Sequence, residues 1–264
     1  MPTLPTRVPN PTASEAAASE PAASEPAALS LGSGEMFNRI ATRYDRLNRF
    51  MSFGLDRLWR RRLVRSLGPL AAGDRVLDVA SGTADVAIAV ASAWPGTLIT
   101  GLDPSAGMLG VGRDKVAVDG LVARIELVVG DAQALPFPDD HFAATCISFG
   151  IRNVPDRALG LREMARVTRP GGVVAVLELS EPRGGLLSPF ARFHVHHVVP
   201  RLGAWLSGER EYRYLQESIA AFPPAQDFAA LMTASGLAIE RVQAQTLATA
   251  HLYVARKTPA PPPD

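Results

Sequence analysis

The chain has 264 residues, of which 47% are hydrophobic and 20% are charged, and its formal net charge at pH 7 is +1. This composition predicts a folded protein with one large domain or two small ones, and the near-neutral charge gives no electrostatic case for nucleic acid as the main partner. The single cysteine, Cys146, excludes an internal disulfide and favours a reducing compartment.

The two ends of the chain differ in composition from the rest. Residues 1–35 repeat an Ala-Ser-Glu-Pro unit and contain no aromatic residue, and residues 259–264 are mostly proline. Such segments cannot bury enough apolar surface to offset the entropy that ordering would cost. We therefore predict a disordered tail over 1–35, one domain over 36–258 and a short Pro-rich tail over 259–264.

No uninterrupted apolar run approaches the roughly 20 residues that span a bilayer, so we expect a cytoplasmic protein, or at most a peripheral one at the inner face of the membrane. The segment Met36–Leu67 is helical by pattern, with a break near Ser52–Gly54. Its second half carries five arginines, namely Arg57, Arg60, Arg61, Arg62 and Arg65. Such a run is most simply a solvated face, and the alternative is a face that contacts anionic lipid headgroups.

From Arg75 onward, strand and helix patterns alternate. The expected strands are Arg75–Ala80, Thr97–Leu102, Arg124–Val129, Ala143–Phe149 and Val173–Leu179, with helices at Asp85–Ala93, Ala106–Val118 and Arg157–Val167. Pro170-Gly171-Gly172 is expected to end the last helix and turn the chain into the fifth strand. After Ser180 we expect helices over Leu186–Trp205, Glu211–Ala221 and Gln226–Ala234, and then two closing strands, Leu237–Gln243 and Thr246–Ala255. This order predicts an α/β, Rossmann-like fold with a mostly parallel seven-stranded sheet, helices on both faces and a helical insertion before the last two strands.

A candidate cofactor loop follows the first strand, where Ser81-Gly82-Thr83 separates it from the next helix. A strand, a tight turn and a helix start bring backbone N–H groups up to a ligand. Ala80, Gly82 and Ala84 stand where an alternating-glycine loop has three glycines, and a methyl at Ala84 is tolerable only without a positive φ. About twenty residues on, Asp103 has the spacing of a carboxylate that accepts the ribose hydroxyls of a nucleoside. The alternative is an N-cap for the helix that begins near Ser105.

Polar residues follow four of the expected strands at the edge where open α/β sheets bind ligands. They are Ser81–Thr83 after the first strand, Asp103 after the second, Asp131-Ala132 after the third, and Ser148 with Arg152-Asn153 after the fourth. The alternative for Asp131, taken alone, is a turn residue after the third strand. Their convergence predicts a binding site at this edge.

Several blocks of sequence are more specific than this pattern. They include Tyr44-Asp45-x-Leu47-Asn48-x-x-Met51-Ser52, Ser148-Phe149-Gly150-Ile151-Arg152-Asn153-Val154, Arg166-Val167-Thr168-Arg169-Pro170-Gly171-Gly172 and Tyr212-x-Tyr214-Leu215. With these blocks the chain, from Met36 to about Lys257, resembles the demethylmenaquinone and 2-methoxy-6-polyprenyl-1,4-benzoquinol C-methyltransferases. These are class I S-adenosylmethionine-dependent methyltransferases of quinone biosynthesis.

The resemblance implies S-adenosyl-L-methionine as the cofactor and assigns residues to it. The implied cofactor contacts are Asp78, Gly82, Thr83, Asp103, Asp131, Ala132 and Ser148. Asp103 would bind the ribose hydroxyls, Asp131 and Ala132 the adenine, and Asp78 would touch the methionine ammonium or act from behind it. No metal is expected, and His194, His196 and His197 are more simply structural or substrate-lining residues.

The implied catalytic residues are Arg152, Asn153 and Tyr44. A quinol ring carbon attacks a methyl group only when the adjacent hydroxyl loses its proton, and a phenol has a pKa of about 10. We expect Arg152 to lower that pKa as a fixed cation, Asn153 to orient the oxygen or a water, and Tyr44 to position the ring. The alternative for Arg152 is an ion pair with a carboxylate such as Asp156.

The expected partner is a polyprenylated quinol, most simply demethylmenaquinol, with the polyprenyl-benzoquinol intermediate of ubiquinone synthesis as the alternative. Leu186–Trp205 would be an apolar lid over the prenyl tail or ordinary core packing. The sequence is also compatible with a methyltransferase that acts on a different small molecule and with a non-catalytic quinone- or lipid-binding subunit. Peripheral membrane contact and a homodimer are compatible with the sequence, and neither is required by it.

Overall fold

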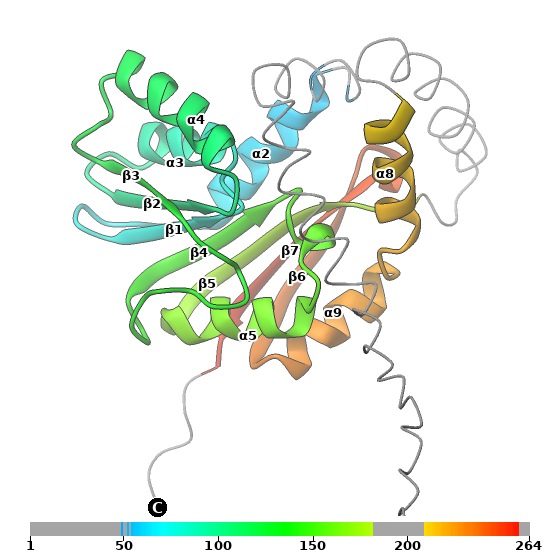
Figure 1. Ribbon diagram of the computed structural model, residues 1–264. Coiled ribbons are helices and arrows are strands. Elements are labelled where there is room, and N and C mark those ends of the chain that lie inside the picture. The colour runs from blue at the N-terminus through cyan, green and yellow to red at the C-terminus, as the bar shows by residue number, and fades with distance from the viewer. Residues whose placement is uncertain (1–48, 50–51, 53, 182–208, 259–264) are drawn as a thin grey trace, which may run out of the picture.

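The computed structural model describes residues 49, 52, 54–181 and 209–258 (Figure 1). Tyr44, the predicted helical stretch Leu186–Trp205 with its three histidines, and both predicted tails lie outside the described residues. The domain boundaries at 36 and 258 therefore stay predictions. None of the helices within the described ranges is long and apolar enough to cross a bilayer.

Seven strands form a single sheet in the order β3-β2-β1-β4-β5-β7-β6. The strands are β1 (Arg75–Val79), β2 (Leu98–Asp103), β3 (Ile125–Val129), β4 (Phe142–Ser148), β5 (Thr168–Leu179), β6 (Leu237–Gln245) and β7 (Ala250–Lys257). β1 to β5 pair in parallel, whereas β7 is antiparallel to both of its neighbours, β5 and β6. The strand order reverses between β1 and β4, which is where this kind of sheet binds ligands.

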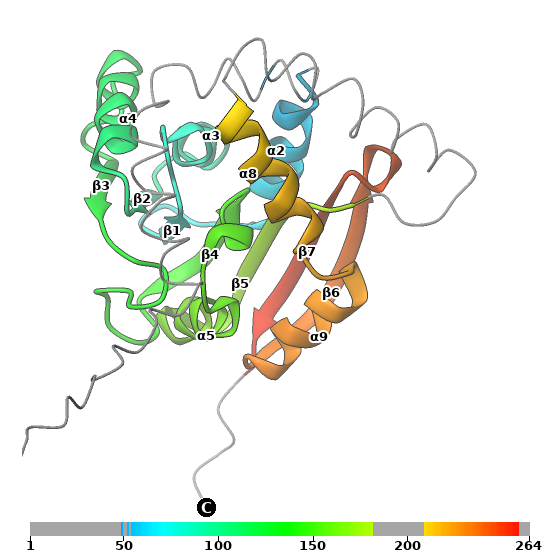
Figure 2. The ribbon, with the colours of Figure 1, turned by 45° about the vertical axis from the view of Figure 1, so that its right-hand side comes forward.

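Within the described ranges the helices are α2 (Leu55–Ser66), α3 (Asp85–Ala93), α4 (Ala106–Val118), α5 (Arg157–Val167), α8 (Glu209–Ala220) and α9 (Ala225–Ala234), with short 3-10 turns η1 (Ile151–Asn153) and η3 (Thr246–Ala248). α2, α3 and α4 cover one face of the sheet, and α5 and α9 cover the other (Figures 1 and 2). The prediction of a mostly parallel seven-stranded sheet with helices on both faces is confirmed, as are the bounds of α3, α4 and α5.

Each face of the sheet has its own core. On the α2 face, Trp59 and Leu63 of α2 pack with Val90 of α3 and with strand residues such as Val76. On the opposite face, α5 and α9 bury Met164, Phe228 and Met232 against the sheet, where the Phe228 and Tyr253 rings are 4.8 Å apart. Because both faces are covered, the central strands are apolar along nearly their whole length, and this is why they were recognisable in the sequence.

Two boundaries differ from the prediction by four residues or more, and the others by at most two. Pro170-Gly171-Gly172 is not a turn before β5 but part of it, because the strand already begins at Thr168, which pairs with Phe142. The pairing register then shifts between Phe142 and Ala144, and Gly171 absorbs the irregularity with φ = 74°. β7 begins at Ala250 rather than Thr246, because Leu247 and Ala248 adopt left-handed φ angles and Thr246–Ala248 form the short turn η3 instead.

Gly150, which follows β4, lies close to Ala80, which follows β1, and this close approach gives a testable prediction. A Cβ on Gly150 would lie 2.4 Å from Ala80 Cβ and 3.1 Å from Ile147 Cγ1. We expect Gly150→Ala to destabilise the fold by about 1–3 kcal/mol through overpacking, seen as a lower Tm in thermal unfolding. The control is Gly110→Ala in α4, where a Cβ would meet nothing within 4 Å and where alanine should add up to about 1 kcal/mol. Equal shifts in the two variants would contradict this packing argument.

Candidate active site

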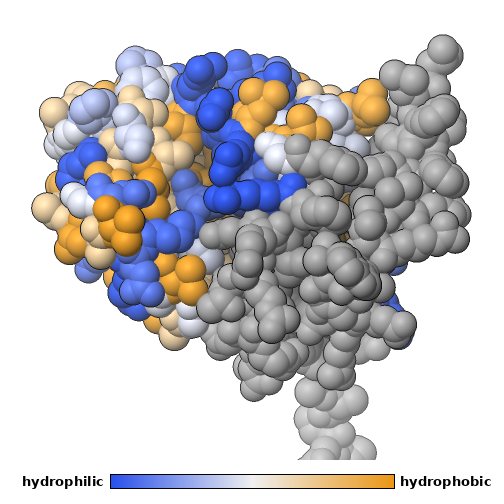
Figure 3. Space-filling view, turned by 90° about the horizontal axis from the view of Figure 1, so that it is seen from above, coloured by the Kyte–Doolittle hydropathy of each residue, from blue (hydrophilic) through white to orange (hydrophobic). Residues whose placement is uncertain are grey.

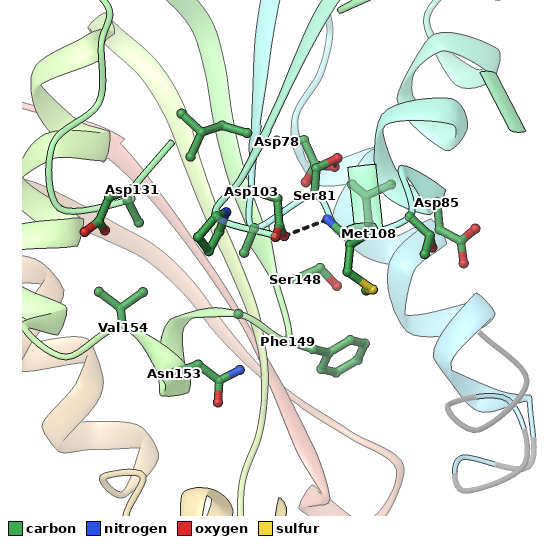
Figure 4. A pocket seen from close by; sticks show the side chains of 18 of the residues that line it. Asp78, Ser81, Asp85, Asp103, Met108, Asp131, Ser148, Phe149, Asn153 and Val154 are labelled. Carbon is green, nitrogen blue, oxygen red and sulfur yellow. Dashed lines mark hydrogen bonds between the residues drawn. The ribbon is translucent and has the colours of Figure 1, made fainter. Parts of the chain in front are cut away.

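A cavity of about 290 Å³ opens at the carboxyl ends of β1, β2 and β4, next to the point where the strand order reverses (Figure 4). Eight of the residues singled out from the sequence line it, namely Asp78, Gly82, Thr83, Asp103, Asp131, Ala132, Ser148 and Asn153. Arg60, Asp85, Met108 and Phe149 also line it, although the sequence pattern did not assign them to the site. Figure 4 places Asp131 and Met108 on opposite sides of Asp103.

Asp103 holds the loop after β1 and the start of α4 together. Its Oδ2 accepts the backbone N–H of Gly82 at 2.9 Å, and its Oδ1 accepts the N–H of Ser105 at 2.8 Å. The N-cap alternative for Asp103 is wrong, because Ser105 is the N-cap and its Oγ accepts the N–H of Met108 at 3.1 Å. Burial raises the pKa of Asp103, and the two N–H donors partly offset this. The carboxylate is thus oriented with acceptor capacity left for a ligand's hydroxyl groups.

The loop between β1 and α3 alternates left-handed residues. Ala80, Gly82 and Ala84 have φ angles of 53°, 56° and 64°. Ala84 therefore has the positive φ at which its methyl group is unfavourable. A left-handed alanine costs about 1–2 kcal/mol. A Cβ on Gly82 would lie 3.2 Å from Met108 Cε, so glycine here keeps the backbone open toward the cavity.

Asp78 is a buried carboxyl group at the base of the cavity. It is 1% exposed, its Oδ2 accepts the Ser81 hydroxyl at 2.7 Å, and the Cys146 thiol lies 3.7 Å from its Oδ1. Desolvation by burial raises its pKa to about 7, against the lowering effects of Ser81, Cys146 and Arg60. A cationic ligand group beside Asp78 would favour its ionised form.

Charged residues from three helices meet at the start of α3. Asp85 accepts Arg60 Nη1 at 2.6 Å and also pairs with Lys115, which in turn donates to the Thr83 hydroxyl at 3.2 Å. Burial alone would raise the pKa of Asp85, but the hydrogen bond from Lys115 and the charge of Arg60 lower it. The arginine run of α2 therefore supplies one residue, Arg60, to the wall of the cavity.

Two polar residues on the β3 and β4 side behave differently. The Ser148 hydroxyl is buried and has no hydrogen-bond partner among the described residues, which fits a site where a ligand supplies one. Asp131 is exposed, and its Oδ1 accepts the Gln133 N–H at 2.9 Å, as a turn residue would. It lines the cavity all the same, so the turn holds its carboxylate at the edge where a base could reach it.

Arg152 lies behind the cavity wall and not on it. Its Nη1 donates to Glu178 Oε1 at 2.8 Å and to the Phe149 carbonyl at 2.7 Å, while its backbone N–H donates to Glu178 Oε2 at 3.2 Å. The alternative of an ion pair thus fits the structure, but the partner is the fully buried Glu178, since Asp156 is the N-cap of α5.

Asn153, unlike Arg152, lines the cavity, and its side chain is held by a residue of α8. The Tyr214 hydroxyl on α8 donates to its Oδ1 at 3.0 Å. Tyr214 belongs to the sequence block Tyr212-x-Tyr214-Leu215, which was the one signal that could have identified it. Arg152 and Tyr214 therefore both hold η1 in place, and Asn153 of η1 lines the cavity (Figure 4).

Comparison with known proteins agrees with this geometry. The family model described as the ubiE/COQ5 methyltransferase family matches residues 30–257. A relative from Geobacter sulfurreducens, named ubiquinone/menaquinone biosynthesis C-methyltransferase UbiE, is 44% identical over 224 residues, covering 84% of this chain and 87% of that protein. A protein of the same name from Stenotrophomonas maltophilia is 41% identical over 206 residues, covering 77% of this chain and 81% of its own.

Solved structures share the fold at low identity. The [4+2]-cyclase SpnF matches with a TM-score of 0.63 at 20% identity, covering 87% of this chain and 96% of its own. A SAM-dependent methyltransferase from Aquifex aeolicus matches with a TM-score of 0.55 at 15% identity, covering 75% of this chain and 89% of its own. One fold thus carries both a cyclase and a methyltransferase, so these likenesses define the fold and not the reaction.

The raised pKa of Asp78 makes stability depend on pH. Because its pKa rises from 3.8 to about 7 on folding, its contribution to stability is complete below about pH 4 and is lost as the pH rises through 7. Asp78→Asn still accepts the Ser81 hydroxyl but cannot ionise. We expect the free energy of unfolding of the wild type to fall relative to the variant over this range, by at most about 4 kcal/mol. Urea unfolding of both proteins across the range tests this, and parallel pH profiles would contradict it.

Proposed function

Because the chain belongs to the ubiE/COQ5 methyltransferase family, we propose that it methylates a ring carbon of a polyprenylated quinol, with demethylmenaquinol as the acceptor. Family membership makes it an S-adenosylmethionine-dependent C-methyltransferase of ubiquinone or menaquinone biosynthesis, so the alternative of a non-catalytic subunit is set aside. The observation that carries the proposal is the convergence of Asp103, Asp131, Ser148 and Asn153 on one cavity.

The residues of the cavity fit the cofactor. We assign the ribose hydroxyls to Asp103, whose carboxylate is held by two backbone donors. Asp131 and Ala132 receive the adenine, and the Ser148 hydroxyl gains the partner that it lacks among the described residues. Asp78 lies near the methionine ammonium, where the positive charge favours its ionised form, and Gly82 and Thr83 of the β1–α3 loop pass alongside.

Bound S-adenosylmethionine supplies a methyl group that its sulfonium makes electrophilic, so this chain has to orient the acceptor and favour its deprotonated form. Among the residues that line the cavity, we assign Asn153 to hold the quinol oxygen or a water beside it. Arg152 is already neutralised by Glu178, which weakens its direct effect on a quinol hydroxyl. We therefore assign Arg152 to positioning η1. Tyr44 keeps its proposed role of placing the ring.

We also propose that the reaction takes place at a membrane. A polyprenyl tail partitions into a bilayer, so the enzyme would work as a peripheral protein on the leaflet from which it takes its acceptor. The benzoquinol intermediate is the second candidate acceptor, because the names of the relatives include both ubiquinone and menaquinone synthesis.

The test of the function is transfer of a labelled methyl group from S-adenosylmethionine to chemically reduced demethylmenaquinol and, in parallel, to the reduced methoxy-polyprenyl benzoquinol. Label in the naphthoquinol supports the proposal. Label in the benzoquinol alone moves the assignment to ubiquinone synthesis, and label in neither quinol overturns the proposed acceptor class.

The arrangement around η1 predicts graded effects of two substitutions. Asn153→Ala should lower kcat by about 100-fold, because the acceptor oxygen loses its orienting group. Tyr214→Phe removes one hydroxyl that fixes Asn153 and should lower kcat by about tenfold.

Both variants should bind S-adenosylmethionine within about threefold of the wild type by calorimetry, since neither side chain holds the cofactor in this assignment. Loss of cofactor binding in Asn153→Ala, or wild-type turnover, would contradict the role.

A further inference from the structure

The outer side of α2 presents basic residues at one-turn intervals. Arg57, Arg61 and Arg65 are all exposed and stand four residues apart, so they form one ridge along the helix. Among the described residues, the two carboxylates that the structure shows on or beside α2, Asp56 and Asp85, are engaged by other groups. Asp56 is buried and accepts the Ser52 hydroxyl at 2.9 Å, and Asp85 is engaged by Arg60 and Lys115. The ridge is therefore a local concentration of positive charge on a chain of almost neutral net charge.

The tip of the β6–β7 hairpin lies against the same helix. Trp59 Nε1 donates to Thr246 Oγ1 at 3.1 Å, and Arg62 Nη1 donates to Gln245 Oε1 at 2.5 Å. Because β7 runs antiparallel to β5, with Ser180 N–H donating to the Thr249 carbonyl at 3.1 Å, this tip is at the carboxyl edge of the sheet. The cavity opens at the same edge, and Trp59 packs against Phe149 of the cavity wall with ring centroids 6.3 Å apart.

Two leucines are exposed on these two elements. Leu58 on α2 is 42% exposed, and Leu247 at the hairpin tip is 50% exposed. Single exposed leucines are common, but Leu247 and Ala248 also hold consecutive left-handed conformations with φ of 54° and 59°. Consecutive left-handed non-glycine residues are strained, and here the strained turn carries a half-exposed apolar side chain. Viewed from above, the described part of the molecule shows a hydrophilic band with hydrophobic residues beside it (Figure 3).

We propose that the α2 ridge and the hairpin tip form a docking surface for an anionic lipid bilayer. Guanidinium groups attract phosphate headgroups, and leucines beside them enter the boundary between headgroups and acyl chains, as in interfacial helices. This surface meets the wall of the cavity at Arg60 of α2, so docking would bring the membrane beside the cavity. The functional purpose of docking rests on the proposed function, because only a lipid-soluble acceptor requires the cavity to lie beside a membrane. Binding of the surface to lipid does not itself depend on methyl transfer.

Vesicle sedimentation tests the surface with the full chain. We expect binding to vesicles containing phosphatidylglycerol and little binding to pure phosphatidylcholine. Arg57→Gln with Arg61→Gln should weaken binding to the anionic vesicles by about 25-fold, since each basic residue near such a surface contributes about fivefold. The matched control is Arg162→Gln with Arg241→Gln, which removes the same charge from exposed positions on α5 and β6 and should leave binding within about twofold.

A second variant tests the apolar part and covers a failure of the first to fold. Leu247→Asn tolerates a left-handed backbone and removes the exposed leucine. It should weaken vesicle binding by about fivefold and raise Tm or leave it unchanged. Equal weakening by the α2 pair and the control pair would overturn the proposal, as would equal binding to neutral and anionic vesicles or no binding to either.

The proposal and the proposed function fail separately. Vesicle binding without methylation of either quinol would overturn the acceptor assignment and leave the docking surface intact. Methylation of a short-chain quinol in solution, together with no vesicle binding, would overturn the docking surface and leave the acceptor assignment intact.

Discussion

The carboxylate of Asp103 is the constraint on which the site depends. It lies at the end of β2, and through the N–H groups of Gly82 and Ser105 it fixes both the loop after β1 and the first turn of α4. Those two segments form one side of the cavity. A buried carboxylate with two backbone donors keeps its orientation without a ligand, so the entropy of arranging the site is lost on folding and not on binding.

A second fixed group lies across the cavity. The buried pair of Glu178 and Arg152 joins the end of β5 to η1, and Tyr214 reaches η1 from α8. Breaking such a buried pair typically costs about 3–5 kcal/mol, because one charge is left without its partner. Asp103 thus orients the side of the cavity assigned to the cofactor, and the Glu178–Arg152 pair holds the side that carries Asn153. Arg60 of α2 lines the cavity, and other arginines of the same helix are exposed.

The sequence predicted the elements well and the long-range partners poorly. The apolar runs that end in Asp103 and Ser148 identified strand ends, and parallel strands bring those ends to one edge. Nothing in the sequence pairs Arg152 with Glu178, which stands in an apolar run that reads simply as a buried strand. Likewise Arg60 meets Asp85 only after α2 packs beside α3. The start of β5 was missed because Pro170-Gly171-Gly172 is a turn signal that the strand accommodates as an irregularity.

The measurement that tests the central claim most directly is calorimetric titration of S-adenosylmethionine into the wild type and Asp103→Asn. An asparagine of the same shape offers one accepting oxygen in place of two, so it cannot accept from both N–H groups and a ribose. We expect the affinity to fall by about 10- to 100-fold and the free energy of unfolding to fall by about 1–3 kcal/mol, because one buried N–H loses its acceptor. An unchanged affinity in a folded variant would contradict the account, because the cofactor would then bind without the carboxylate that organises the cavity.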